Sequence, residues 1–72
     1  MIVLSSDEVV LRLEHIAREE GRHTFISGRL RVDAEYVGDM GQVYFRVNGV
    51  GALRNAVIRA IDEARLNQTM MV

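Results

Sequence analysis

The chain has 72 residues, no cysteine and a formal net charge of −1, and 49% of its residues are hydrophobic. This length leaves room for a single domain, residues 1–72, and the apolar content excludes a disordered chain. The lack of cysteine excludes a disulfide framework and a thiolate metal site. The net charge provides no overall positive field of the kind that attracts nucleic acid.

A domain of this size buries only about 60% of the surface that its unfolded chain exposes. Association with another chain is a common source of the missing stability. The apolar segment Met1–Leu4 is too short for a membrane span. It also lacks the basic segment and the longer apolar segment that a signal peptide has. Together with the lack of cysteine, this predicts a cytoplasmic protein without membrane contact.

A first helix is predicted from about Ser6 to Glu20. Ser5 and Glu8 have the spacing of a capping box, which satisfies N–H groups at the start of a helix. Gly21 supplies the left-handed residue that often ends one. The segment carries one apolar stripe at helical spacing, made of Val9, Leu13, Ile16 and Ala17, with Val10 on its flank.

Two segments that alternate between apolar and polar residues predict a β-hairpin around Gly38–Gly41. If Val37 pairs with Gln42, the apolar pairs on one face are Tyr36–Val43, Ala34–Phe45 and Val32–Val47. The same register places Asp33 opposite Arg46 and Glu35 opposite Tyr44 on the other face. A slip of one residue would bury charged side chains, so we expect this register.

A second helix is predicted from about Ala52 to Asn67, because apolar residues recur there at helical spacing. Its stripe consists of Leu53, Ala56, Val57, Ala60, Ile61 and Ala64. We expect Asn48–Gly51 to break the preceding strand, Ile2–Leu4 to form a short strand, and His23–Ser27 to extend the next strand with a bend at Gly28. The predicted fold class is α+β, in the order β-α-β-β-α, with two helices on one face of a small antiparallel sheet.

The sequence favours no catalytic, cofactor-binding or metal-binding residues. His15 falls on the solvent side of the first helix and His23 in a connection, so neither has an implied partner. The carboxylates of Glu19-Glu20 and Asp62-Glu63 are sequence neighbours that diverge on a helix. We therefore expect a protein that is not an enzyme and needs no cofactor.

Two groups of residues are candidates for binding other macromolecules. Arginines near Tyr44 can contact RNA by charge and stacking, although cross-strand pairing with Asp33 and Glu35 also explains them. The RNA-contact candidates are Arg29, Arg31, Arg46 and Arg54. Apolar residues off the core stripes mark a surface for partner docking. The docking candidates are Leu11, Ile58, Leu66 and Met70.

Three short motifs resemble the small dimerising subunit of KEOPS, the complex that makes threonylcarbamoyl adenosine in tRNA. Ser5–Val9 opens the first helix after a short apolar segment. Val43–Val47 is the apolar strand that leads toward the last helix. Ala52–Arg54 opens that helix, and Ile61-Asp62 follows at a similar distance. Gly49–Gly51 departs from the family, which has small polar and acidic residues there.

The resemblance implies a β-α-β-β-α domain that forms a homodimer, or a heterodimer with a paralogue, through a continuous sheet. It also implies docking to the catalytic transferase subunit through the helices, at Ile58 and Leu66, and help in holding tRNA at Arg31, Arg46 and Arg54. Catalysis and its metal then belong to the partner.

Two other functions are compatible with the same features. A small interaction or inhibitor protein, of the kind found in phages and toxin systems, shares the size and the mild acidity. A stand-alone RNA-binding module would use the arginines beside Tyr44.

Overall fold

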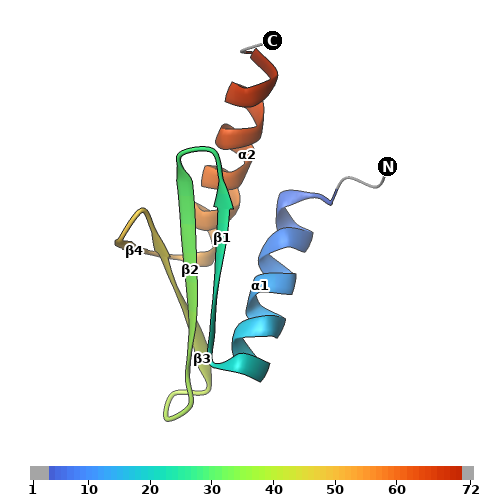
Figure 1. Ribbon diagram of the computed structural model, residues 1–72. Helices are drawn as coiled ribbons and strands as arrows, with labels where there is room; N and C mark the ends of the chain where they lie inside the picture. The colour runs from blue at the N-terminus through green and yellow to red at the C-terminus, as the bar shows by residue number, and fades with distance from the viewer. Residues whose placement is uncertain (1–3, 71–72) are drawn as a thin grey trace.

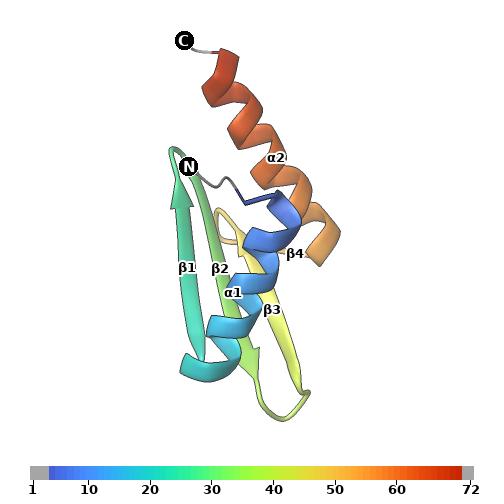
Figure 2. The same ribbon diagram turned by 90° about the vertical axis from the view of Figure 1, so that its right-hand side faces the viewer.

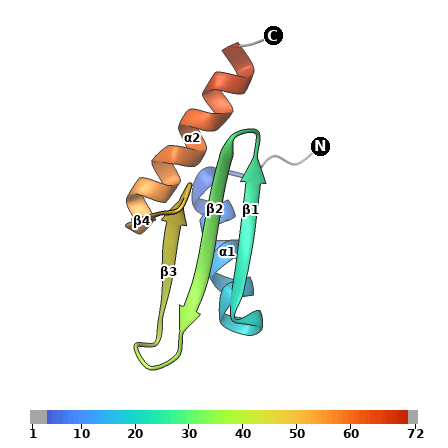
Figure 3. The ribbon, with the colours of Figure 1, turned by 60° about the vertical axis from the view of Figure 1, so that its left-hand side comes forward.

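The computed structural model describes the backbone of residues 4–70 and the side chains of residues 4–66. The elements in chain order are α1 (Ser6–Glu20), β1 (Arg22–Ser27), β2 (Leu30–Val37), β3 (Gln42–Val47), β4 (Val50–Ala52) and α2 (Arg54–Met70). The strands form one antiparallel sheet in the order β1-β2-β3-β4. Both helices lie on the same face of this sheet (Figure 1; Figure 3). The predicted α+β class, with two helices on one face of a small antiparallel sheet, is confirmed.

Helix α1 begins and ends where its local sequence predicts. The Glu8 backbone N–H donates to the Ser5 hydroxyl oxygen at 3.2 Å, and that hydroxyl donates to Glu8 Oε1 at 3.2 Å. Ser5 therefore satisfies one of the N–H groups that a helix start leaves unpaired. At the other end, the Gly21 N–H donates to the Ala17 carbonyl at 2.7 Å.

The predicted register of β2 and β3 is confirmed in full. Val37 pairs with Gln42, and the pairing continues residue by residue to Val32 and Val47. Val32, Ala34 and Phe45 are buried under the helices. The inner face of the hairpin is therefore apolar and the outer face carries its charged residues.

The order of the elements differs from the predicted β-α-β-β-α at the segment before β2. The segment containing His23–Ser27 does not extend β2; it belongs to a separate strand, β1, which pairs antiparallel with β2 across a two-residue turn. Gly28 has φ +60 in that turn, a backbone conformation that residues with a side chain rarely adopt. The predicted strand at Ile2–Leu4 falls mostly outside the described residues, and Leu4 lies in no strand.

The segment Asn48–Gly51 ends β3 as predicted, but part of it also forms a further strand that was not predicted. Asn48 and Gly49 have φ +50 and +86, the positive values that a type I′ hairpin turn requires at both central residues. The chain therefore folds back as β4, which pairs with the end of β3. Ala52 belongs to β4, so α2 begins two residues later than predicted.

The core lies between the sheet and the two helices. It consists of Val9, Val10, Leu13 and Ala17 from α1, Leu30, Val32, Ala34 and Phe45 from the sheet, and Val57 and Ile61 from α2. The predicted stripe of the second helix is correct at Val57 and Ile61 but wrong at Leu53, which is 83% exposed. Leu53 precedes the helix, so the helical period does not apply to its side chain.

Polar contacts hold the two helices in an antiparallel pair. Near the start of α1, Ser6 donates a hydrogen bond to Asp62, and the Leu4 carbonyl accepts one from Arg65. Farther along, Arg54 Nε lies 3.2 Å from Glu14 Oε1. The last turns of α2 extend past the end of the sheet (Figure 1). Within residues 4–70, neither helix has the length and apolar composition needed to cross a membrane.

We predict that Ile61→Ala lowers the free energy of unfolding by roughly 2 to 5 kcal/mol, because the side chain is 1% exposed and its loss leaves a cavity. Urea unfolding followed by circular dichroism measures this change. Leu53→Ala is the control and should change the unfolding free energy by less than about 0.5 kcal/mol. Equal effects of the two substitutions would contradict the assigned core.

Candidate functional site

The face of the sheet away from the helices is open to solvent and mostly polar. The register places Arg22, Thr24 and Ile26 from β1 on this face, together with Arg31, Asp33 and Glu35 from β2 and Tyr44 and Arg46 from β3. It carries three arginines against two carboxylates. This open face is therefore close to neutral and lacks the strong positive field of a typical nucleic-acid surface.

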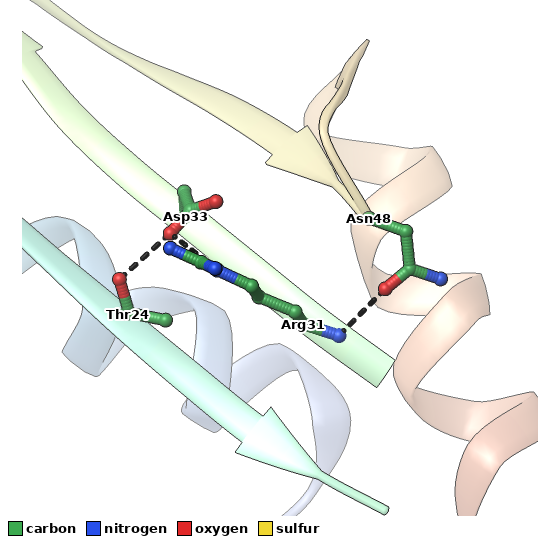
Figure 4. Close-up of polar contacts among 4 residues, drawn as sticks. All are labelled: Thr24, Arg31, Asp33 and Asn48. Carbon is green, nitrogen blue, oxygen red and sulfur yellow. Dashed lines mark hydrogen bonds and ion pairs between the residues drawn. The ribbon is translucent and has the colours of Figure 1, made fainter. Parts of the chain in front are cut away.

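Asp33 is the centre of the polar contacts on the open face (Figure 4). Its Oδ1 accepts a hydrogen bond from the Thr24 hydroxyl at 2.7 Å and one from Arg31 Nε at 3.3 Å. The Thr24 bond is the largest cause that holds the pKa of Asp33 below its ordinary value of 3.8. The bond from Arg31 and the charges of Arg31 and Arg46 lower the pKa further, whereas partial burial raises it. Asp33 thus neutralises much of the basic charge beside it.

Asn48 joins the turn after β3 to the start of β2. Its side-chain Oδ1 accepts from the Arg31 N–H at 2.8 Å (Figure 4). Its own N–H donates to the Arg31 carbonyl at 2.8 Å. These two bonds continue the β2–β3 ladder beyond its last residue pair. The backbone of Arg31 is therefore fixed, while its side chain is 62% exposed.

The four predicted RNA-contact residues do not form one site. Arg31 and Arg46 share the open face, on neighbouring strands. Arg29 lies in the turn between β1 and β2. Arg54 lies in the helix layer, where it pairs with Glu14. The structure thus brings two of the four residues together and separates the others.

The predicted docking residues lie in the helix layer. Leu11 on α1 and Leu66 on α2 are exposed, at 55% and 60%. Ile58 is instead half-buried and packs against the core, so it contributes to folding as well as to the surface. The side chain of Met70 lies outside the described part. Leu11 and Leu66 therefore remain the apolar positions of the outer helix surface.

The outer edge of β1 is a feature that the sequence reasoning missed. β1 is the first strand of the sheet and pairs only with β2 (Figure 2). Beside it, an apolar groove between α1 and β1 is lined by Leu4, Val9, Arg12, Leu13, Ile16, His23 and Phe25. The sequence does contain a sign of this separate strand. The two residues Gly28-Arg29 lie between two strand-like segments, a spacing that predicts a hairpin.

The histidine and carboxylate side chains of residues 4–66 were compared with the needs of a metal site. No group of three or more histidine or carboxylate side chains there could hold a metal ion. His15 Nε2 lies 3.2 Å from Glu19 Oε1 on the exposed side of α1. This surface ion pair needs a protonated histidine and stabilises the helix only slightly.

Comparison with known proteins finds no family model that matches this sequence, and no curated protein or solved structure matches it either.

We predict that Thr24→Val raises the pKa of Asp33 toward 3.8, because it removes the hydrogen bond that lowers this pKa most. NMR titration of the Asp33 carboxyl carbon measures the change. Thr24→Ser keeps the hydroxyl and should keep the low pKa. If Thr24→Val leaves the pKa where it is in the wild type, the assigned cause is wrong.

The same bond makes stability depend on pH. The pKa of Asp33 is lower in the folded than in the unfolded chain, so ionised Asp33 stabilises the fold above about pH 3.8. That contribution is lost as the pH falls through the folded-state pKa. Between neutral pH and acid, Thr24→Val should therefore lose less unfolding free energy than the wild type.

Proposed function

We propose that this chain is a non-catalytic accessory subunit that acts by binding other proteins. The observation that carries the proposal is the pair of exposed leucines on the outer side of the helix layer, Leu11 and Leu66. Neither is needed for the core, which α1 and α2 complete with other residues. Large apolar side chains exposed to solvent beyond the needs of the core are candidates for a protein interface.

The helix layer is suited to present such a surface rigidly. The contacts of Arg54 with Glu14 and of Ser6 with Asp62 join α1 and α2 at two points along their length. Leu11 lies between Ser6 and Glu14 on α1, and the half-buried Ile58 lies between Arg54 and Asp62 on α2. Leu11 and Ile58 therefore fall at the same level of the helix pair, whereas Leu66 lies one helical turn beyond the contact at Asp62.

In the form that the sequence resemblance implies, the chain is the dimerising subunit of a KEOPS-like complex in the cytoplasm. The catalytic transferase subunit docks on the helix layer and supplies the chemistry, and the chain supports threonylcarbamoyl adenosine modification of tRNA. The order helix, hairpin, helix supports this proposal. The strands β1 and β4 have no counterpart in the β-α-β-β-α order of that family.

We predict that Leu66→Glu weakens binding to a KEOPS transferase subunit at least tenfold, or about 1.4 kcal/mol, because it places a charge in an apolar contact. Binding is measured by calorimetry with purified proteins. Met40→Glu is a matched control, since Met40 is 61% exposed and Leu66 is 60% exposed, but Met40 lies in the turn after β2. A wild-type chain that does not bind the transferase would overturn the KEOPS form of the proposal.

Contact with single-stranded RNA is a second candidate function, favoured by Tyr44. Its side chain is 47% exposed on the open face, on the same strand as Arg46. Aromatic side chains beside arginine stack on bases and pair with phosphates. Asp33 and Glu35 oppose this contact, so we expect weak binding that depends on salt.

If the open face binds RNA, exchanging Arg31 and Arg46 for Gln should lower affinity for a single-stranded RNA at low salt at least tenfold. It should also reduce the dependence of affinity on salt, since fewer phosphates are neutralised. Fluorescence anisotropy measures both quantities. Arg12→Gln with Arg59→Gln makes the same change of charge on the helices and should have little effect. Equal losses from the two pairs would point to a non-specific charge effect.

A further inference from the structure

The open face of the sheet has a hollow where β4 pairs with β3. It measures about 270 Å³ and is lined by Asp33, Glu35, Tyr44, Phe45, Arg46 and Gly51. Gly51 lies opposite Arg46 in the ladder, and its lack of a side chain leaves the sheet surface open at that point. A Cβ atom at Gly51 would meet no described atom within 4 Å apart from its chain neighbours. Sites for drug-sized ligands measure about 300 to 1,000 Å³, so this hollow suits a smaller group.

Three side chains around the hollow offer three different kinds of contact. The ring of Tyr44 is exposed and provides an aromatic surface for stacking. Glu35 lies directly opposite Tyr44 on β2 and provides two carboxylate oxygens that only accept hydrogen bonds. Arg46 lies two residues further along β3 and provides a fork of donors. The hollow therefore combines an aromatic ring, a pair of acceptors and a fork of donors.

The polar groups of Glu35 and Arg46 are available to a ligand. Asp33 is already bonded to its neighbours on β1 and β2 (Figure 4). The side chains of Glu35 and Arg46, in contrast, make no hydrogen bond or ion pair within residues 4–66, and Arg46 interacts with Asp33 through charge alone. Arg22 faces Glu35 from β1 without an ion pair to it.

The directions of these two polar groups fit two adjoining edges of one purine ring. Neighbouring strands are displaced at a right angle to the strand direction. Glu35 therefore reaches a ring stacked on Tyr44 from the side, whereas Arg46 reaches it from along β3. Guanine has two adjacent donors, N1–H and N2–H, on its Watson–Crick edge and two acceptors, O6 and N7, on its Hoogsteen edge. A carboxylate on the first edge and an arginine on the second satisfy all four groups.

The other bases do not present this set of groups. Adenine has an acceptor, N1, where guanine has a donor, and this acceptor would face the Glu35 carboxylate. Cytosine also presents a ring acceptor, N3, on that edge. Uracil has a single N–H donor between two carbonyl oxygens. An acceptor held against a carboxylate loses its hydrogen bond, which weakens binding, so the hollow favours guanine.

We propose that the hollow beside Gly51 binds a guanine base stacked on the Tyr44 ring. The base donates N1–H and N2–H to the Glu35 carboxylate and accepts hydrogen bonds from Arg46 at O6 and N7. This inference rests on the second candidate function, contact with single-stranded RNA, and names the base that the strand supplies. Glu35 repels phosphates but accepts from the base, so it contributes selectivity at the cost of affinity for other sequences.

We predict that an oligouridine with one central guanine binds roughly tenfold more tightly at low salt than oligouridine alone, because one matched set of base contacts has about this effect. Fluorescence anisotropy of the labelled strand measures the affinity. Inosine lacks the N2 amine and 7-deazaguanine lacks N7, so each should lose most of the increase. Equal affinity for the strands with and without guanine overturns the proposal.

Two variants test the residues of the hollow. Glu35→Gln should raise affinity for oligouridine, because it removes a charge that repels phosphates, and should abolish the preference for guanine. Gly51→Val fills the hollow at a position where a side chain meets no clash, and should also abolish the preference while the circular dichroism spectrum stays unchanged. Glu63→Gln removes the same charge from an exposed position on α2 and should keep the preference. A preference that survives both Glu35→Gln and Gly51→Val contradicts the assigned site.

The same titrations distinguish this inference from the functions proposed above. RNA that binds without a preference for guanine refutes the guanine site and leaves RNA contact standing. If guanosine monophosphate binds in a way that depends on Glu35, and RNA does not bind, the site stands and RNA contact fails. If neither binds at millimolar concentration, both are refuted. Docking through Leu66 is measured with the transferase and depends on none of these results.

Discussion

Burial of the inner side of β2 and β3 under the two helices determines which residues of the sheet face solvent. Val32 and Val57 are completely buried, and Ala34 and Ile61 are 1% exposed, so this contact leaves no room for a polar residue. The side-chain period of a strand is two, so the residues next to Val32 and Ala34 on β2 point to the opposite face of the sheet. The polar face and the two sheet edges follow from this packing.

The charges on the open face are arranged mainly to balance one another. Asp33 accepts hydrogen bonds from Thr24 and Arg31 and lies opposite Arg46 in the sheet. One carboxylate therefore interacts with three neighbouring side chains. Such a network holds the strands in register, and it leaves little unbalanced positive charge for a polyanion. This is why the proposed function relies on apolar surfaces more than on the arginines.

The exposed leucines of the helix layer and the open edge of β1 lie on different parts of the molecule. Leu11 and Leu66 face outward from the helix layer, whereas the edge of β1 lies at the side of the sheet (Figure 2).

The sequence by itself determined the features that depend on neighbouring residues or on strict alternation. The bounds of α1 follow from Ser5 and Gly21, which act within one helical turn. The β2–β3 register follows from Val37 and Gln42, because only one pairing keeps charge out of the core on both strands. The type I′ turn at Asn48-Gly49 could also have been predicted from the sequence, since Asn-Gly is a strong hairpin signal.

Only the tertiary structure decided the features that depend on residues distant in the chain. Arg54 pairs with Glu14, 40 positions away, and no local pattern indicates that contact. The exposure of Leu53 depends on where β4 ends and α2 begins. The open edge of β1 exists because no other described segment pairs there, which is a property of the whole sheet. Local sequence specifies helix ends and strand faces, whereas edges and long-range ion pairs arise when the elements pack together.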